Sequence, residues 1–196
     1  AVELAKRENV DLIIGTDPDA DRVGVIVRNR DGEYVTISGN QMGVLLLDYI
    51  ISAKRDAGEL TDKSYAVKTI VTTEMARKVC EVNKVKMYET FTGFKFIAGK
   101  VEEVGAEGFL LGYEESYGYL AGSYVRDKDA VTAALVLTEM AAWYADQNMT
   151  LYDALMGLYE KYGFYAEKTL NLVMPGLDGL KKMAQLMADL RANPYT

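Results

Sequence analysis

The sequence of 196 residues contains no histidine and one cysteine, Cys80. Without histidine, the chain cannot supply a Ser-His-Asp triad, a histidine general base or histidine ligands for zinc. A single cysteine cannot form an internal disulfide, which is typical of a protein from a reducing compartment. We therefore expect a cytoplasmic protein.

The chain is also poor in positive charge and in long hydrophobic runs. Its 22 Lys and Arg residues against 29 Asp and Glu give a net charge of −7. This balance argues against nucleic acid or an anionic membrane as a partner, although a local basic pocket for phosphate remains open. The longest apolar stretch, residues 44–51, is interrupted by Asp48 and is far shorter than the ~20 residues of a membrane span. Residues after Ala1 lack the pattern of a signal peptide.

What the chain does contain is enough apolar material for a folded core. Hydrophobic residues make up 49% of the sequence, and the length suits one large domain or one domain plus part of another. Residues 1–9 have helical composition with no capping residue before them. We therefore expect them to be the rear of a helix that begins upstream.

Short apolar segments alternate with helical patterns along most of the sequence. We expect Asn40 to cap a helix that runs to about Ala57. The Thr-Leu-Tyr-Asp segment at 150–153 resembles a capping box before another helix. The pattern predicts strands at 11–15, 23–28, 33–38, 65–71, 86–90, 108–112 and 169–174, and further helices at 74–82, 94–104, 130–145, 151–162 and 177–192.

This alternation predicts an α/β fold with a mixed, largely parallel sheet and flanking helices. In such sheets ligands bind beyond the carboxyl ends of the strands. Three polar segments follow predicted strands, at 72–73, 91–95 and 113–118. We expect them to converge on one site.

An acidic loop separates two of the apolar strands. Asp17, Asp19 and Asp21 alternate along it and Arg22 follows directly. Three neighbouring carboxylates repel one another unless a cation or protons offset them, and oxygen-only ligands suit Mg²⁺. Arg22 would then suit a phosphate or sugar oxygen. A solvated acidic turn is the alternative, and an aspartate nucleophile of the haloacid-dehalogenase type would need Thr or Val at position 21.

A second loop, Gly-Tyr-Glu-Glu-Ser-Tyr-Gly at 112–118, carries Glu114, Glu115 and Ser116 between glycines. Carboxylates can accept from two neighbouring hydroxyl groups, which suits a sugar, while a plain charged turn is the alternative. Polar or basic residues from the same predicted edge could hold a phosphate: Thr92, Gly93, Lys95, Arg126 and Lys128.

Three motifs together resemble those of the α-D-phosphohexomutases, the phosphoglucomutase/phosphomannomutase enzymes. They are GTDPDADR at 15–22, TGFK at 92–95 and GYEESYG at 112–118. The resemblance implies a four-domain enzyme that interconverts hexose 1-phosphate and hexose 6-phosphate. A phosphoserine in the first domain and a hexose 1,6-bisphosphate intermediate carry the phosphoryl group. Residues 1–60 would then be part of the metal-binding second domain, 61–175 the sugar-binding third domain, and 176–196 a helix toward the fourth.

The resemblance also implies roles for individual residues. Asp17, Asp19 and Asp21 would bind Mg²⁺, and Arg22 would contact the phosphate or sugar beside it. Glu114 and Ser116 would hold the sugar hydroxyls, with Thr92 and Gly93 in the orienting loop. Some members have Thr-Gly-His where this sequence has Thr-Gly-Phe at 92–94, which leaves Lys95 or Lys128 as the acid–base candidate.

No phosphoserine loop and no phosphate-clamping loop of this family is found in the sequence. We therefore expect a fragment that is inactive alone and needs the N-terminal and C-terminal domains of the same enzyme. Glucose phosphate is the favoured substrate, with phosphomannomutase or phosphopentomutase activity as alternatives. A non-catalytic module that binds Mg²⁺ or a sugar phosphate is the alternative from a different class.

Overall fold

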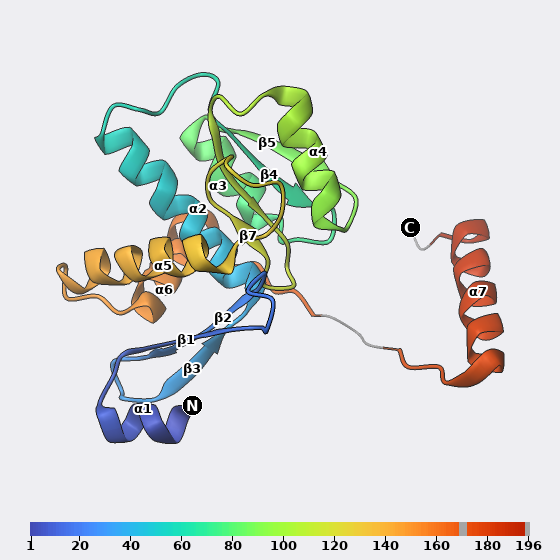
Figure 1. Cartoon of the computed structure of the whole chain (residues 1–196), viewed down its shortest axis with the longest axis horizontal. Coiled ribbons are helices and arrows are strands. Elements are labelled where there is room, and N and C mark those ends of the chain that lie inside the picture. The colour runs from blue at the N-terminus through green and yellow to red at the C-terminus, as the bar shows by residue number, and fades with distance from the viewer. Residues whose placement is uncertain (169–171, 195–196) are drawn as a thin grey trace. The chain divides into compact units, whose positions relative to one another are not determined.

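The computed structural model describes residues 1–168 and 172–194. It divides into a larger unit, residues 1–165, and a smaller one, residues 166–196. All the candidate site residues belong to the larger unit, whose elements are shown in Figure 1.

The first sheet of the larger unit is antiparallel, in the order β1-β2-β3. It follows the short helix α1 (Val2–Glu8) and consists of β1 (Leu12–Thr16), β2 (Val23–Arg28) and β3 (Tyr34–Ile37). Pairing of Thr16 with Val23 makes residues 17–22 the loop of a hairpin. Alternate residues of β2 are buried, because successive side chains of a strand point to opposite faces.

The second sheet has the order β5-β4-β6-β7 and is parallel except for β7. Its strands are β4 (Tyr65–Thr69), β5 (Lys86–Thr90), β6 (Phe109–Tyr113) and β7 (Tyr119–Leu120). Helices α3 (Met75–Asn83) and α4 (Phe94–Val104) provide the crossovers. Thr69 pairs with Thr90, and Lys68 with Tyr113, so the carboxyl ends of the three parallel strands are level.

Helices cover both faces of this second sheet (Figure 1). One face joins a large apolar core that includes α2 (Gly39–Asp56), α3, α5 (Ala130–Ala145) and α6 (Leu151–Tyr162), together with β2. A smaller core of Tyr65, Val67, Phe94, Ile97 and Leu120 lies between the other face and α4. Every residue of β4 is buried as a result, which is typical of a central parallel strand. The predicted α/β class is confirmed.

The predicted cap of α2 is wrong by two residues. Ser38 is the N-cap, and its hydroxyl and the Gln41 side chain form a reciprocal capping box with the backbone. Ser followed three residues later by Gln satisfies two helix donors at once, so the helix begins at Gly39. Asn40 instead accepts a hydrogen bond from the Thr73 amide at 3.0 Å. The capping box predicted at Thr150 and Asp153 is present.

Two strand predictions differ from the structure by more than one residue at an end. The strand predicted to reach residue 71 ends at Thr69, because a turn follows in which the Thr72 amide donates to the Thr69 carbonyl. The short strand β7 is not anticipated at all. Of the strand predicted at 169–174, residues 169–171 lie outside the described residues, and 172–174 have no strand pairing.

Helix α7 (Gly176–Ala192) is the smaller unit's one described element and agrees with the prediction at 177–192. It exposes apolar side chains, among them Leu177 and Leu180.

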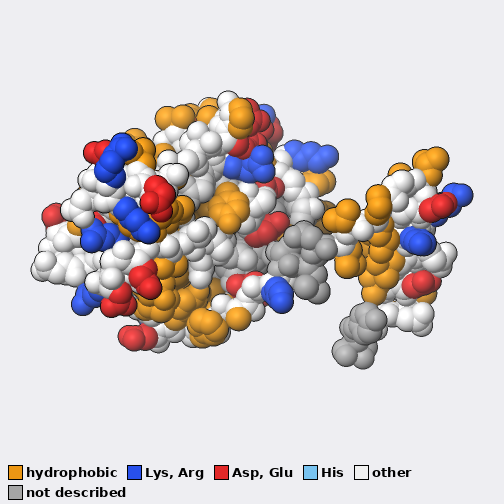
Figure 2. All heavy atoms as spheres, turned by 90° about the horizontal axis from the view of Figure 1, so that it is seen from below, with side chains coloured by type: hydrophobic (Ala, Val, Ile, Leu, Met, Phe, Trp, Pro, Cys, Tyr) orange, Lys and Arg blue, Asp and Glu red, His pale blue; other side chains and the backbone are white. Residues whose placement is uncertain are grey.

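Figure 2 shows charged side chains of both signs spread over the visible face of the larger unit. Among the described residues, no helix is both long and apolar enough to cross a membrane.

Candidate functional site

The acidic loop closes the β1–β2 hairpin and brings its three carboxylates together. Oxygen atoms of Asp17, Asp19 and Asp21 lie within 4.8 Å of one another. Asp17 organises the loop, because its Oδ1 accepts from the backbone amides of Asp21 and Arg22, both at 3.1 Å. The Ala20 carbonyl accepts from the Ala130 amide at 3.0 Å, which ties the loop to the start of α5.

Two cationic side chains approach these carboxylates. Arg22 Nε lies 2.7 Å from Asp17 Oδ2 and 3.4 Å from Asp21 Oδ1. Lys128 Nζ lies 2.8 Å from Asp21 Oδ2, and its side chain is only 17% exposed. The backbone amide of Arg22, followed by its guanidinium, holds the pKa of Asp17 well below its usual value, while the hydrogen bond to Asp17 raises the pKa of Arg22.

The pKa of Lys128 reflects two opposing effects. Partial burial by itself lowers this pKa, but the hydrogen bond and the charge of Asp21 outweigh burial, so the pKa rises above its ordinary value. Arg22 and Lys128 therefore both carry a positive charge at neutral pH. The three carboxylates outnumber these two cations, and Asp127 also lies 3.8 Å from Lys128 Nζ, so negative charge is in excess around the loop.

The donor set fits a divalent metal ion with oxygen ligands. Asp21 Oδ1 is buried and accepts no hydrogen bond from any residue that the structure describes. Its contact with Arg22 Nε at 3.4 Å is an ion pair without hydrogen-bond geometry, so this buried oxygen keeps the capacity to accept a stronger ligand contact. Carboxylate oxygens at this spacing are ligands that Mg²⁺ prefers.

Of the second loop, residues 114–118 join β6 to β7 and lie at the carboxyl ends of the parallel strands. Glu114 is 8% exposed. Its Oε1 accepts from the Gly93 amide at 3.2 Å, and its Oε2 accepts from the Ser116 hydroxyl at 3.4 Å. Glu115 turns toward Thr72, whose hydroxyl is 3.4 Å from Glu115 Oε2. The three polar segments predicted to converge therefore do so.

Backbone contacts bring the two loops face to face. Arg22 pairs with Gly118 in an isolated antiparallel bridge, and the Val23 amide donates to the Tyr117 carbonyl at 3.1 Å. The aliphatic stem of Lys128 packs on Gly118, where an added Cβ would lie 2.1 Å from Lys128 Cδ. Lys128 thus touches the second loop with its stem and the acidic loop with its ammonium group.

The remaining four predicted residues have contacts in or around α4. Gly93 is the N-cap of α4 and has a φ of 110°, a conformation that favours glycine, and the exposed Thr92 precedes it. Lys95 Nζ lies 5.0 Å from the centroid of the Phe96 ring. Arg126 pairs with Glu102 on α4 at 3.0 Å. These contacts of Lys95 and Arg126 are thus with side chains of α4 and not with the acidic loop.

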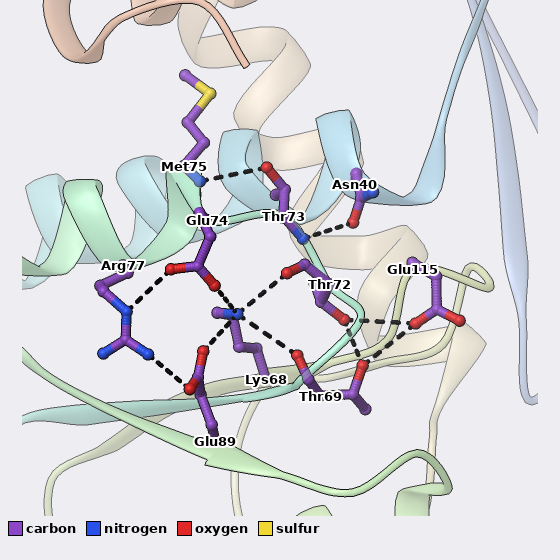
Figure 3. Close-up of polar contacts among 10 residues, drawn as sticks. All are labelled: Asn40, Lys68, Thr69, Thr72, Thr73, Glu74, Met75, Arg77, Glu89 and Glu115. Carbon is purple, nitrogen blue, oxygen red and sulfur yellow. Dashed lines mark hydrogen bonds and ion pairs between the residues drawn. The ribbon is translucent and has the colours of Figure 1, made fainter. Parts of the chain in front are cut away.

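A buried ionic network beneath the second loop was not anticipated from the sequence (Figure 3). Lys68 is fully buried, and its Nζ lies 2.8 Å from Glu74 Oε1, 2.7 Å from Glu89 Oε1 and 3.0 Å from the Thr72 carbonyl. Arg77 bridges the second oxygens of the same two glutamates, at 3.0 and 2.6 Å. A lysine in an otherwise apolar predicted strand was the signal that could have revealed it.

Together, the layered sheet and the two facing loops define an α/β protein with a polar ligand site at the carboxyl ends of parallel strands. A family model described as phosphoglucomutase/phosphomannomutase, alpha/beta/alpha domain III, matches residues 38–162. The chain therefore belongs to the phosphoglucomutase/phosphomannomutase family, as the resemblance of its motifs predicts.

Individual relatives agree with this assignment. Phosphoglucomutase of Staphylococcus aureus (strain N315) is 36% identical over 195 residues, which cover 99% of this chain and 35% of that protein. The chain thus spans about a third of the length of the curated relatives it matches. The fold is similar to that of a putative phosphomannomutase from Thermus thermophilus, with a TM-score of 0.60 and 24% identity over 78% of this chain and 31% of the other.

A more distant structure has the same fold. Aspergillus fumigatus N-acetylphosphoglucosamine mutase, solved in complex with GlcNAc-6P and magnesium, gives a TM-score of 0.56 at 15% identity. The match covers 81% of this chain and 39% of that one.

Proposed function

We propose that the chain carries the metal-binding and sugar-binding loops of a phosphohexomutase that interconverts hexose 1-phosphate and hexose 6-phosphate, with glucose as the preferred sugar. The observation that carries the proposal is the position of Lys128. Its stem packs on Gly118 of one loop, and its ammonium group pairs with Asp21 of the other at 2.8 Å. A phosphorylated sugar bound there would contact both loops at once.

In this proposal Asp17, Asp19 and Asp21 hold Mg²⁺. The ion supplies charge stabilisation to a phosphoryl group in transfer. The buried Asp21 Oδ1, which accepts no hydrogen bond from the described residues, and the spacing of the three carboxylates support this assignment. The A. fumigatus relative, solved with magnesium, adds support from a chain of the same fold.

Arg22 and Lys128 bind the phosphoryl oxygens. Both are cationic at neutral pH, and their carboxylate partners fix their positions. Arg22 offers a planar fork of donors, whereas Lys128 offers a point charge. Because the two approach from different loops, they stabilise negative charge from two sides of the group.

Glu114 and Ser116 hold neighbouring sugar hydroxyls, and Thr92, Gly93 and Lys95 belong to the loop that helps to orient the sugar. The Gly93 amide and the Ser116 hydroxyl already orient the Glu114 carboxylate.

A hexose 1,6-bisphosphate is the proposed intermediate, which presents first one phosphorylated end and then the other to the phosphoserine. The phosphoserine that exchanges the phosphoryl group is proposed to lie in the part of the relatives that this chain does not span. A cytoplasmic location and the domain limits at residues 60 and 175 stay predictions.

Calorimetry on the chain tests the proposal directly. Mg²⁺ is titrated first, and glucose 1,6-bisphosphate is then titrated in its presence. Asp19→Ala should weaken Mg²⁺ binding at least tenfold, and Glu114→Gln should weaken bisphosphate binding by about tenfold with Mg²⁺ affinity unchanged. Asp31→Ala is the matched control, since Asp31 is an exposed aspartate in the turn after β2.

Two results would contradict the proposal. Mg²⁺ affinity that is equal in the Asp19→Ala and Asp31→Ala proteins would remove the metal assignment. Absence of bisphosphate binding to the unaltered chain in saturating Mg²⁺ would remove the sugar-phosphate assignment. Retained binding with no turnover, after the remaining domains are supplied, would favour the alternative of a non-catalytic binding module.

A further inference from the structure

The second loop contains two adjacent glutamates that face different surroundings. Glu114 contacts Gly93 and Ser116, which belong to the candidate sugar site. Glu115 reaches toward the end of β4, where its Oε2 lies 3.2 Å from the Thr69 hydroxyl and 3.4 Å from the Thr72 hydroxyl (Figure 3). The two carboxylates are adjacent in the sequence but contact different parts of the structure.

The hydroxyl groups of Thr69 and Thr72 both contact Glu115. Thr69 is 0% and Thr72 is 3% exposed, and their hydroxyl oxygens are 2.6 Å apart. Three oxygens in mutual contact share two hydroxyl protons, so two of the three contacts are hydrogen bonds in any one arrangement of the protons. Glu115 Oε2 can accept from at least one threonine hydroxyl in each of these arrangements. A sugar hydroxyl would have to break this arrangement in order to reach Glu115 Oε2.

The turn that carries the threonines is itself fixed from below. Lys68 donates to the Thr72 carbonyl at 3.0 Å and is held by Glu74 and Glu89. Because Lys68 is fully buried, a shift of the Thr72 backbone would remove one hydrogen bond of an ammonium group that has no water to replace it. The hydroxyls are thus presented to Glu115 by a rigid base.

The backbone of Glu115 is restrained on its other side by α2. A Cβ placed on Gly39 would lie 2.0 Å from the Glu115 carbonyl oxygen, so only glycine allows this approach. The loop is closed by a hydrogen bond of 2.9 Å from the Glu114 amide to the Gly118 carbonyl. Glu115 is therefore the fixed point of the loop, between the two residues proposed to contact the sugar.

We infer that Glu115 is a positioning residue, anchored by Thr69 and Thr72, that aims Glu114 and Ser116 at the hydroxyl groups of the bound sugar. The inference rests on the proposed function of the second loop. It assigns Glu115 no contact with the ligand. Its effect falls on the sugar moiety and leaves the phosphate and metal contacts of Arg22 and the aspartates unchanged.

The test compares the affinity for glucose 1-phosphate with that for inorganic phosphate, by calorimetry in saturating Mg²⁺. Glu115→Ala should lower the affinity for glucose 1-phosphate about tenfold and leave the affinities for phosphate and Mg²⁺ within about twofold. Glu115→Gln keeps an acceptor oxygen for the threonines and should restore most of the sugar affinity. Glu107→Ala is the control, because Glu107 is an exposed glutamate paired with Lys63 at 2.8 Å.

A second pair of measurements reports on the anchor without a ligand. Amide exchange at Glu114 should accelerate about tenfold in Glu115→Ala but not in Glu115→Gln. Valine at both Thr69 and Thr72 removes the same anchor from the other side and should reproduce the loss of sugar affinity.

The possible failures can be told apart. Unchanged exchange at Glu114, or unchanged sugar affinity in Glu115→Ala beside a native chain that prefers glucose 1-phosphate to phosphate, overturns the inference alone. Equal loss of phosphate and sugar affinity in Glu115→Ala also overturns it. A native chain that binds glucose 1-phosphate no better than phosphate overturns the proposed function, and the aiming role with it.

Discussion

Replacement of Lys68 by methionine should destabilise the larger unit by about 3 kcal/mol. Methionine keeps most of the aliphatic stem but removes the ammonium group, which is fully buried against Glu74 and Glu89. Breaking a buried ion pair on one side costs about 3–5 kcal/mol. The lower end applies because the Glu74 and Glu89 side chains are 56% and 30% exposed and Arg77 still contacts both.

The assay is urea unfolding at neutral pH, combined with thermal unfolding. For a unit of this size, 1 kcal/mol corresponds to about 2–4 °C, so the midpoint should fall by roughly 6–12 °C. Lys63→Met is the matched control, because Lys63 also contacts a glutamate at 2.8 Å but is exposed. It should cost less than about 1 kcal/mol. Conversion of both Glu74 and Glu89 to glutamine in the Lys68→Met protein should recover part of the loss.

The loss of stability caused by Lys68→Met should depend on pH. The hydrogen bond from Lys68 lowers the pKa of Glu74 from its ordinary value of 4.5. A carboxylate with a lowered pKa stabilises the folded state above its unfolded pKa and loses that effect as the pH falls through its folded pKa. The gap between the native and Lys68→Met proteins should therefore be largest above pH 4.5 and narrow below it. Equal stability losses in the Lys68 and Lys63 variants, or a gap that persists in acid, would refute this reasoning.

Three further predictions concern single positions. Burial raises the pKa of the Cys80 thiol to about 12, so a disulfide reagent at pH 8 should label it only on unfolding; rapid labelling of the folded chain would contradict its burial. Gly39→Ala should lower the stability and increase amide exchange in the second loop, because its methyl group would meet the Glu115 carbonyl; unchanged exchange in a mass-spectrometric measurement would count against the contact. Thr150→Ala should cost about 1 kcal/mol in urea unfolding by removal of the capping box with Asp153, and Thr150→Ser should cost little.

Most elements could be predicted because their patterns are local. Strand 23–28 and helices 94–104 and 130–145 have the predicted bounds, since apolar periodicity and flanking polar residues mark their ends. The cap of α2 was misplaced because Ser38 and Asn40 are both good capping residues. Only the reciprocal partner, Gln41, separates them.

The sequence also predicted which polar segments converge, but not which residue of each segment faces the candidate sugar site. Alternation of strands and helices brings strand ends to one edge, a property of topology alone. The division between Glu114 and Glu115 depends on the direction of each side chain relative to Thr69 and Gly93, which loop residues do not reveal through periodicity. The apolar neighbours of Lys68 in its strand signal its burial, but its two carboxylate partners could not be predicted, because they come from the start of α3 and from β5.

Backbone hydrogen bonds fasten the acidic loop to its neighbours at both ends, through Val23 to Tyr117 and through Ala130 to Ala20. Loops joined in this way are restrained relative to one another. Under the proposed function, a bisphosphorylated sugar that presents each of its ends in turn would meet the same restrained pair of loops in both orientations. Binding in both orientations would then depend on the similarity of the two phosphorylated ends of the sugar, and not on a rearrangement of these two loops.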